Sequence, residues 1–204
     1  HCPNTGSMKN CQKPGSTIWF TLSGNKSRKY PHTWQLIEID SGVLVGINTG
    51  IANRLVLESI QNKTVEKLHG YSKKSTEVPY GNENSRIDIL LEGDGLKDCY
   101  IEVKNVSFGT IAGEGFFPDA VTVRGQKHLK ELMSVKESGA RAVLFFCVQH
   151  SKIESVAPAC EIDPVYAKLL MEAMKCGVEV MAYRSEVDIK SSSIWLEKEL
   201  PVKI

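Results

Sequence analysis

The sequence has no long hydrophobic run, no large excess of one charge and no tightly spaced cysteines. Its longest apolar stretch, residues 142–148, is far shorter than the roughly 20 residues that cross a bilayer as a helix. No membrane contact is therefore predicted. Lysine and arginine number 25 against 24 aspartates and glutamates, for a net charge of +1. A surface that binds nucleic acid must then come from local clustering of cations, because the bulk charge attracts no polyanion.

Six cysteines are spread along the chain at positions 2, 11, 99, 147, 160 and 176. None forms a C-x-x-C pair, so neither a disulfide framework nor a zinc site is indicated, and a reducing cytoplasm is the expected location. The chain also lacks a Walker loop, a dinucleotide fingerprint and a serine-hydrolase elbow. With 204 residues, 42% hydrophobic and 24% charged, it can bury one large or two small cores.

The first 47 residues are β-rich. Three stretches of strand-like sequence, 16–22, 33–39 and 43–47, are separated by turn signals at 23–25 and 40–42. Between the first two stretches lies a basic loop that carries Lys26, Arg28, Lys29 and Tyr30 and is followed by Trp34. Cations for phosphates, interleaved with rings on which bases stack, are typical of surfaces that bind single strands. The alternative is a solvated loop whose aromatic side chains pack beneath it.

A helix is predicted from residue 48 to about residue 63. In this phase Glu58 lies on the same side as Ile51 and Leu55, where a carboxylate is costly unless it is paired or binds a metal. The alternative is a helix-edge glutamate paired with Arg54. Residues 64–84, which include Lys73, Lys74 and Tyr80, are polar and turn-rich and favour a loop beside the site.

The stretch 85–106 is predicted to form a hairpin of two strands, 85–91 and 98–106. With a loop of residues 93–97 the pairing is symmetric about Gly95, so Asp88 faces Glu102. Because side chains alternate along a strand, Glu102 and Lys104 share one face. The hairpin therefore gathers two carboxylates and one ammonium.

Like charges directly opposite each other destabilise a sheet, so this face needs a counter-charge. A divalent cation supplies one, because Mg²⁺ commonly binds between one or two carboxylates and a phosphate. Lys104 would then orient the attacking water or stabilise charge that develops on the phosphate. The alternative is an exposed sheet face with ordinary salt bridges.

The carboxyl-terminal half alternates strands and helices. A helix over about 125–138 places Gln126 inward near its amino end, with Arg124 and Lys127 beside it, and the free N–H groups there favour anions. The alternative is a capping glutamine and a solvated basic face. A buried strand at 142–148, a helix that opens at Asp163-Pro164 and a strand at 178–183 complete a mixed α/β (α+β) sheet flanked by helices.

Several motifs carry a resemblance to known families. Asp88 followed by Glu102-Val103-Lys104 resembles the core of the PD-(D/E)xK nucleases, although Ile87 stands where the named proline would be. The wider set resembles the bacterial and archaeal sugar fermentation stimulation protein A (SfsA) family over essentially the whole chain. It consists of the stretches 1–6 (HCPNTG), 28–34 (RKYPHTW), 52–55 (ANRL), 85–88 (SRID), 99–104 (CYIEVK), 117–122 (FPDAVT) and 124–129 (RGQKHL).

The resemblance implies an OB-like module at 1–47, a PD-(D/E)xK nuclease-like domain at 48–204, and a protein that binds DNA and cleaves DNA or RNA. It also implies that a segment precedes His1. In the superfamily the helix before the hairpin often adds an acid, here Glu58, and the helix after it a polar residue, here Gln126. The expected ligands of Mg²⁺ or Mn²⁺ are Asp88, Glu102, the Val103 carbonyl and Glu58.

The expected catalytic residues are therefore Asp88, Glu102, Lys104 and Gln126. The residues expected to contact nucleic acid are Lys26, Arg28, Lys29, Tyr30, Trp34, Arg86, Arg124 and Lys127. The alternative function is a DNA-binding regulator of sugar (maltose-type) metabolism genes that has no turnover. The sequence is also compatible with a homodimer.

Overall fold

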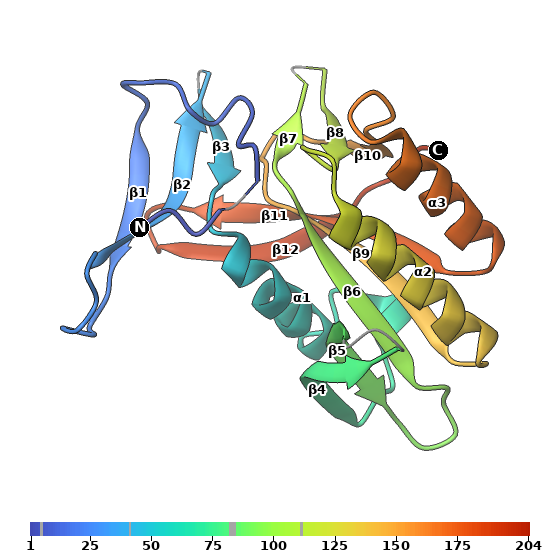
Figure 1. The fold of residues 1–204 in the computed structure, drawn as a ribbon. Helices are drawn as coiled ribbons and strands as arrows, with labels where there is room; N and C mark the ends of the chain where they lie inside the picture. Colours follow the sequence, from blue (N-terminus) through green and yellow to red (C-terminus); the bar gives the residue numbers. More distant parts are fainter. Residues whose placement is uncertain (5, 41, 82–84, 111) are drawn as a thin grey trace.

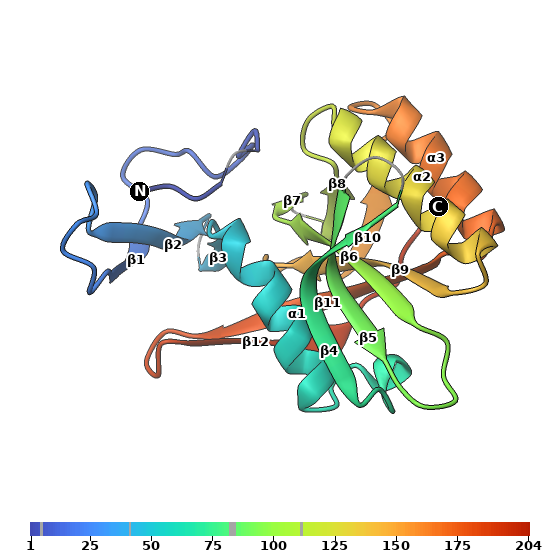
Figure 2. The same ribbon diagram turned by 60° about the horizontal axis from the view of Figure 1, so that its bottom comes forward.

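The computed structural model describes residues 1–4, 6–40, 42–81, 85–110 and 112–204 (Figure 1). A three-stranded sheet at the amino end stands beside a larger domain, whose six-stranded sheet has helices on both faces (Figures 1 and 2). Among the described residues, no helix is both long and apolar enough to cross a membrane.

The amino-terminal sheet is antiparallel in the order β1-β2-β3. Its strands are β1 (Ile18–Leu22), β2 (His32–Ile39) and β3 (Val43–Gly46). Inward-facing residues form a small core of their own, made of Cys11, Ile37, Val45 and Ile47 with Trp34 packed against it. The predicted hairpins are present, although Ser41 of the second predicted turn lies outside the described residues.

The six-stranded sheet has the order β12-β11-β9-β6-β5-β4. Its strands are β4 (Lys73–Tyr80), β5 (Ser85–Glu92), β6 (Cys99–Val106), β9 (Arg141–Val148), β11 (Glu179–Asp188) and β12 (Ser193–Glu199). β9 pairs in parallel with β6 and β11, and the outer pairs are antiparallel. Residues 142–148 of β9 are all buried, as expected for a central strand covered on both faces.

Helix α1 (Ala52–Gln61) covers one face of this sheet, and α2 (Val123–Glu137) and α3 (Pro164–Lys175) cover the other (Figures 1 and 2). Thr122 caps α2 through the N–H of Gly125, and Asp163 caps α3 through the N–H of Tyr166. Single turns η1 (Thr49–Ile51) and η2 (Glu66–Leu68) flank α1. A small sheet contains β7 (Phe108–Gly109), β8 (Glu114–Phe117) and β10 (Ser155–Pro158).

The prediction of a loop over residues 64–84 is wrong for its second half, which forms β4. β4 is an edge strand, so its outer side faces solvent and polar residues such as Lys73 cost nothing there. An edge strand also tolerates Pro79, which cannot donate a ladder hydrogen bond. Residues 64–72 hold the single turn η2 and are otherwise irregular, as predicted, and residues 82–84 lie outside the described residues.

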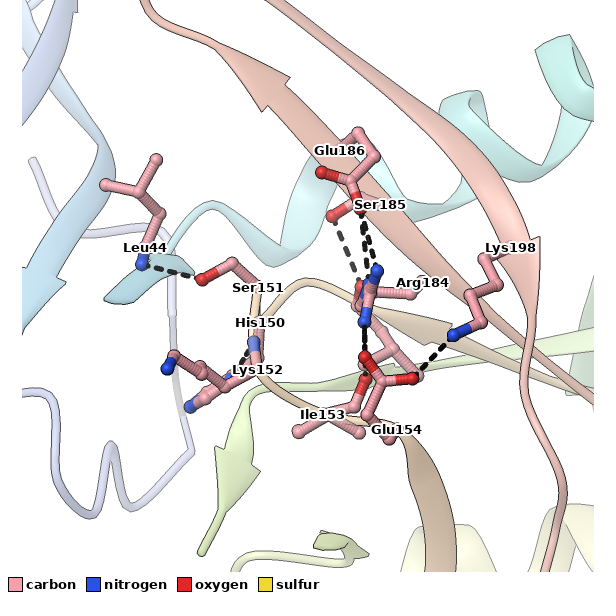
Figure 3. A network of polar contacts seen from close by, with 11 residues as sticks. Leu44, His150, Ser151, Lys152, Ile153, Glu154, Arg184, Ser185, Glu186 and Lys198 are labelled. Atoms are coloured by element: carbon pink, nitrogen blue, oxygen red, sulfur yellow. Dashed lines mark hydrogen bonds and ion pairs between the residues drawn. The ribbon is translucent and has the colours of Figure 1, made fainter. Parts of the chain in front are cut away.

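Residues that follow β9 extend the amino-terminal sheet. The N–H of Gly46 donates to the Gln149 carbonyl (2.8 Å), the N–H of Ser151 donates to the Leu44 carbonyl (2.9 Å), and the Leu44 N–H donates to the Ser151 hydroxyl (3.0 Å; Figure 3). A Cβ at Gly46 would lie 2.5 Å from Gln149 Oε1, so only glycine allows this approach. The two sheets are therefore joined by main-chain pairing.

An ion-pair network holds the segment after this junction. Glu154 lies between Arg184 and Lys198, whose Nζ is 2.7 Å from Glu154 Oε2, and Arg184 also pairs with Glu186 at 3.0 Å (Figure 3). The partners come from β11 and β12. The junction is thus anchored to the far edge of the large sheet.

Asp119 makes a second connection between the two parts. Its Oδ2 accepts hydrogen bonds from the N–H of Ser7 (2.9 Å), the Ser7 hydroxyl (3.0 Å) and the N–H of Met8 (3.3 Å). Thr49 adds a hydrogen bond from its hydroxyl to the Pro3 carbonyl (3.2 Å). One carboxylate therefore ties the amino-terminal segment to the loop before α2.

We expect Asp119→Ala to destabilise the protein by about 2 kcal/mol, because hydrogen bonds to a charged group are lost and their donors are left unpaired. Urea unfolding followed by circular dichroism measures the change. Asp94→Ala, in the exposed turn between β5 and β6, is the matched control and should shift the midpoint little. Equal midpoints for both variants would contradict the role of Asp119.

Candidate active site

The hairpin of β5 and β6 has the register that its turn length predicts. Ile89 pairs with Ile101, Leu90 with Tyr100 and Leu91 with Cys99. Continued by one residue, this register sets Asp88 opposite Glu102. Cys99, Ile101 and Val103 of β6 face α1, so Glu102 and Lys104 point to the side that α2 covers.

Asp88 is fixed by two hydrogen bonds. Its Oδ2 accepts from the backbone N–H of Val103 (2.7 Å), and its Oδ1 accepts from Asn53 Nδ2 (2.8 Å). The carboxylate thus lies just beyond the paired part of the hairpin and links β6 to α1. It cannot swing away without leaving two donors unpaired.

Glu102 is only 2% exposed, and its two oxygens differ. Oε1 accepts from Lys104 Nζ (2.7 Å) and contacts His128 Nδ1 at hydrogen-bonding distance. Oε2 is buried and has no hydrogen-bond partner among the described residues. A buried carboxylate oxygen without a partner is costly, so it points to a ligand that the protein itself does not supply.

His128 connects Glu102 to Arg124. Arg124 Nε lies 3.4 Å from His128 Nε2, and an arginine nitrogen can only donate. In the neutral ring this assigns the lone pair to Nε2 and the proton to Nδ1, which donates to Glu102. The Lys104 ammonium, 3.1 Å from Nδ1, then contacts the ring while it donates to Glu102.

The two carboxylates have opposite pKa shifts. Burial, together with repulsion by Glu102, raises the pKa of Asp88 to about 6 against the hydrogen bonds from Val103 and Asn53. Burial also opposes ionisation of Glu102, but the hydrogen bond from His128 and the charge of Lys104 outweigh it and lower the Glu102 pKa. At neutral pH both groups are therefore ionised, and Asp88 is the one that a cation would relieve most.

This donor set fits a hard divalent cation. Among the described residues no group of three or more His, Cys, Asp and Glu side chains is placed to hold a metal by itself. Two carboxylates, one with an oxygen that is buried and has no partner among the described residues, match a hard divalent cation, whose shell is completed by carbonyls, waters and phosphate. The Val103 carbonyl stays a predicted ligand.

Glu58 does not join this group. Its side chain is 53% exposed and pairs with Arg54 at 3.5 Å. The buried residues of α1 are Ala52, Leu55, Val56, Ser59 and Ile60, so the inward phase begins at Ala52 and not at Ile51. The prediction that Glu58 is a metal ligand is therefore corrected, and Asn53 is the α1 side chain that reaches the hairpin.

Gln126 is also placed elsewhere. Its Nε2 donates to both oxygens of Asp163, each at 3.0 Å, and so ties α2 to the amino end of α3. The buried residues of α2 include Gly125, His128, Leu129 and Leu132, with the spacing i, i+3, i+4, i+7. The prediction that Gln126 belongs to the catalytic set is corrected, because His128 holds the inward position.

His128 and Asn53 are the residues that the sequence reasoning missed. The signal for His128 was its place in the inward spacing that starts at Gly125. Nearby, the Tyr80 hydroxyl and both oxygens of Glu131 are buried and have no hydrogen-bond partner in the described part of the chain. Burial and the charges of Glu102, Glu131 and Asp88 raise the pKa of Tyr80, so this hydroxyl stays protonated.

Two cavities border the group. One of about 260 Å³ is lined by Glu77, Ser85, Arg86, Arg124, Lys127 and His128. The other, of about 320 Å³, lies between the amino-terminal segment and the large domain and includes Lys104, Asn105, Phe117, Asp119 and Arg124 in its walls. Arg124 borders both cavities. Three of the predicted nucleic-acid contacts, Arg86, Arg124 and Lys127, thus gather beside Glu102.

The predicted contacts of the amino-terminal loop lie on the other sheet. Lys26, Arg28 and Lys29 are exposed, and Tyr30 is exposed with Lys29 Nζ 5.2 Å from its ring centre. Trp34 instead packs against the small core, and its Nε1 donates to the Leu36 carbonyl (2.8 Å). Tyr30 therefore remains available for stacking, whereas Trp34 is held as a core residue.

Comparisons with known proteins agree on one family. The family model described as sugar fermentation stimulation protein RE domain matches residues 50–191, and the SfsA N-terminal OB domain matches residues 1–47. A sugar fermentation stimulation protein homolog of Shewanella sp. (strain ANA-3) is 54% identical over the whole chain and 86% of its own length. The structure of Pyrococcus furiosus SfsA in complex with Ca²⁺ aligns over 100% of this chain and 84% of that one, with 28% identity and a TM-score of 0.89.

The raised pKa of Asp88 predicts a pH dependence of stability. The folded state holds a proton between pH 3.8 and about 6 that the unfolded state has released, so this contribution is present below pH 3.8 and lost as pH rises through 6. The stability of the wild type relative to Asp88→Asn should therefore fall by about 2–3 kcal/mol over this window in chelator. Urea unfolding at pH 4–7.5 measures it.

Asp94→Asn, an exposed aspartate, is the control for the general effect of losing a carboxylate. At pH 7.5, Mg²⁺ should raise the melting temperature of the wild type and of Asp94→Asn but much less that of Asp88→Asn, because the asparagine removes one of the two carboxylates that attract the cation. A difference between the wild type and Asp88→Asn that does not vary with pH would contradict the assigned pKa.

Proposed function

Since this chain belongs to the sugar fermentation stimulation protein (SfsA) family, we propose that it binds nucleic acid and hydrolyses phosphodiester bonds of DNA or RNA with a divalent metal ion. One observation carries the proposal: Glu102 Oε2 is buried without a partner in the described part of the chain, beside Asp88 and Lys104. A regulator that only binds DNA has no need of this arrangement, because affinity comes from surface cations.

Asp88 and Glu102, with the Val103 carbonyl, would hold Mg²⁺ or Mn²⁺. Bound there, the ion would polarise the phosphate and supply a water of lowered pKa. The P. furiosus SfsA structure is a complex with Ca²⁺, which supports a divalent-cation site in the family. Asn53 and the Val103 N–H hold the Asp88 carboxylate in one orientation, so the site is organised before any ion arrives.

Lys104 would act on the phosphate, next to the carboxylates of Asp88 and Glu102. Its side chain is 14% exposed, and its ammonium is held by Glu102 at 2.7 Å. From this position it orients the attacking water or stabilises the negative charge of the transition state. Its contact with the 320 Å³ cavity gives it access to a strand that enters between the two parts of the protein.

His128 is a positioning residue. By donating from Nδ1 it holds Oε1 of Glu102, which would leave Oε2 free to hold the ion. Arg124 holds the other ring nitrogen and lies where it can also contact a phosphate. Lys26, Arg28, Lys29 and Tyr30 would add contacts farther along the strand.

The first test is cleavage of labelled single- and double-stranded DNA and RNA with Mg²⁺, Mn²⁺ or chelator. We expect metal-dependent cutting by the wild type and a loss of at least about 10²-fold in kcat for Glu102→Gln and Lys104→Ala, because the first removes a charge that holds the metal ion and the second removes the cation that acts on the phosphate. The glutamine keeps the shape of Glu102, so a folding defect is not the expected cause.

Cutting that survives in both variants would assign the activity to a contaminant. Binding of DNA without cutting by any preparation would instead favour the regulatory function. Melting temperatures of the variants, recorded alongside, show that each compared protein is folded.

His128 and Gln126 form a matched pair of variants on the same helix. His128→Ala should lower kcat about 10–100-fold with a smaller effect on KM, because Glu102 loses its orienting donor. Gln126→Ala should lower stability by about 1 kcal/mol and leave kcat unchanged, since its amide serves the α3 cap. A larger loss of kcat in Gln126→Ala than in His128→Ala would reverse the two assignments.

A further inference from the structure

The cavity beside His128 has the character of an anion pocket. Three cations line its volume of about 260 Å³, Arg86 from β5 and Arg124 and Lys127 from α2. Arg124 stands in the first turn of α2, which contains no acidic residue. A cation at a helix amino terminus is unfavourable against the helix dipole, and neighbouring cations repel one another. An anion bound between these cations relieves both effects.

Both arginines keep donors for a ligand. Arg86 uses NH1 to bind the Glu77 carbonyl (2.7 Å), and Arg124 uses Nε to contact His128. Within the described ranges the other nitrogens of these two guanidinium groups have no hydrogen-bond partner. Two planar donor groups that face one cavity match the oxygens of a phosphate.

The wall that holds Arg86 is strained. Glu77 adopts a φ of +54°, which an L-residue avoids, at the β4 position between the pairs Thr76↔Ile89 and Val78↔Ile87, and so opposite Asp88. Such strain tends to be kept at functional sites. Here it directs the Glu77 carbonyl to Arg86 and sets the guanidinium against the cavity. The Glu77 side chain is exposed, and its charge works against an anion in the pocket.

We propose that Arg86, Arg124 and Lys127 bind a second phosphate of the nucleic-acid strand, next to the one that is cut. This inference rests on the proposed function for the identity of the ligand. Because Arg124 also touches His128, the bound phosphate and the Glu102 carboxylate share one chain of contacts. The phosphate is either an internal diester or the monoester at a 5′ end.

The test is binding of a short fluorescent single strand in chelator, where no cleavage occurs, over a range of salt concentrations. Arg86→Ala should weaken binding about tenfold and reduce the slope of log K against log salt by about 0.7, the value for one phosphate contact on a single strand. Arg86→Lys should keep the slope, because the charge remains. Lys175→Ala, an exposed cation at the far end of α3, is the matched control and should change neither.

Glu77→Gln provides a change in the opposite direction. Removing its charge should tighten binding about two- to fivefold, which a folding defect cannot imitate. Each measurement uses the same strand with a 5′-phosphate and with a 5′-hydroxyl. A loss in Arg86→Ala with both strands assigns an internal phosphate, and a loss only with the phosphorylated strand assigns the terminal one.

Wild-type affinity and slope in Arg86→Ala on both strands would overturn the pocket, as would an equal loss in Lys175→Ala. The result is independent of the nuclease assay. A preparation that cuts nothing but binds less tightly after Arg86→Ala would retain the phosphate pocket and refute the catalytic proposal. A preparation that cuts nucleic acid but binds equally well after Arg86→Ala would refute the phosphate pocket alone.

Discussion

The burial of the Glu102 carboxylate is the constraint on which the rest of the site depends. A charge that is 2% exposed is stable only when its oxygens are paired, and the described part of the protein pairs just one of them, through Lys104 and His128. To do so it must bring α2 down onto β6 at His128. The same packing places Arg124 at the border of two cavities. The carboxylate thus acts together with the buried Leu129 and Leu132, which pack the same face of α2 onto the sheet.

Each layer of the large domain contributes one part of the site. The sheet supplies the carboxylates and the lysine, α1 supplies Asn53 from one face, and α2 supplies His128 from the other. Asp88 is held from the α1 side and Glu102 from the α2 side. The two carboxylates therefore meet at the sheet with opposite pKa shifts, and neither helix can move without changing one of them.

The hairpin could be predicted from the sequence because strand pairing follows from turn length alone, and Asp88 and Glu102 follow from that register. The helical residues could not. A shift of one residue rotates a helix by about 100°, and starting α1 at Ile51 in place of Ala52 brought Glu58 inward and overlooked Asn53. The same error in α2 selected Gln126 over His128. β4 was missed because an edge strand lacks the apolar alternation of a covered one.

The close approach of Gly46 to Gln149 has a mechanical consequence. The amino-terminal sheet continues through main-chain hydrogen bonds into the segment that leaves β9, and Asp119 clamps it a second time. Two such attachments resist bending between the parts. The cavity of about 320 Å³ beside these attachments has walls from both parts, Asn4 and Gly6 on one side and Lys104 and Arg124 on the other, so its shape depends on both attachments.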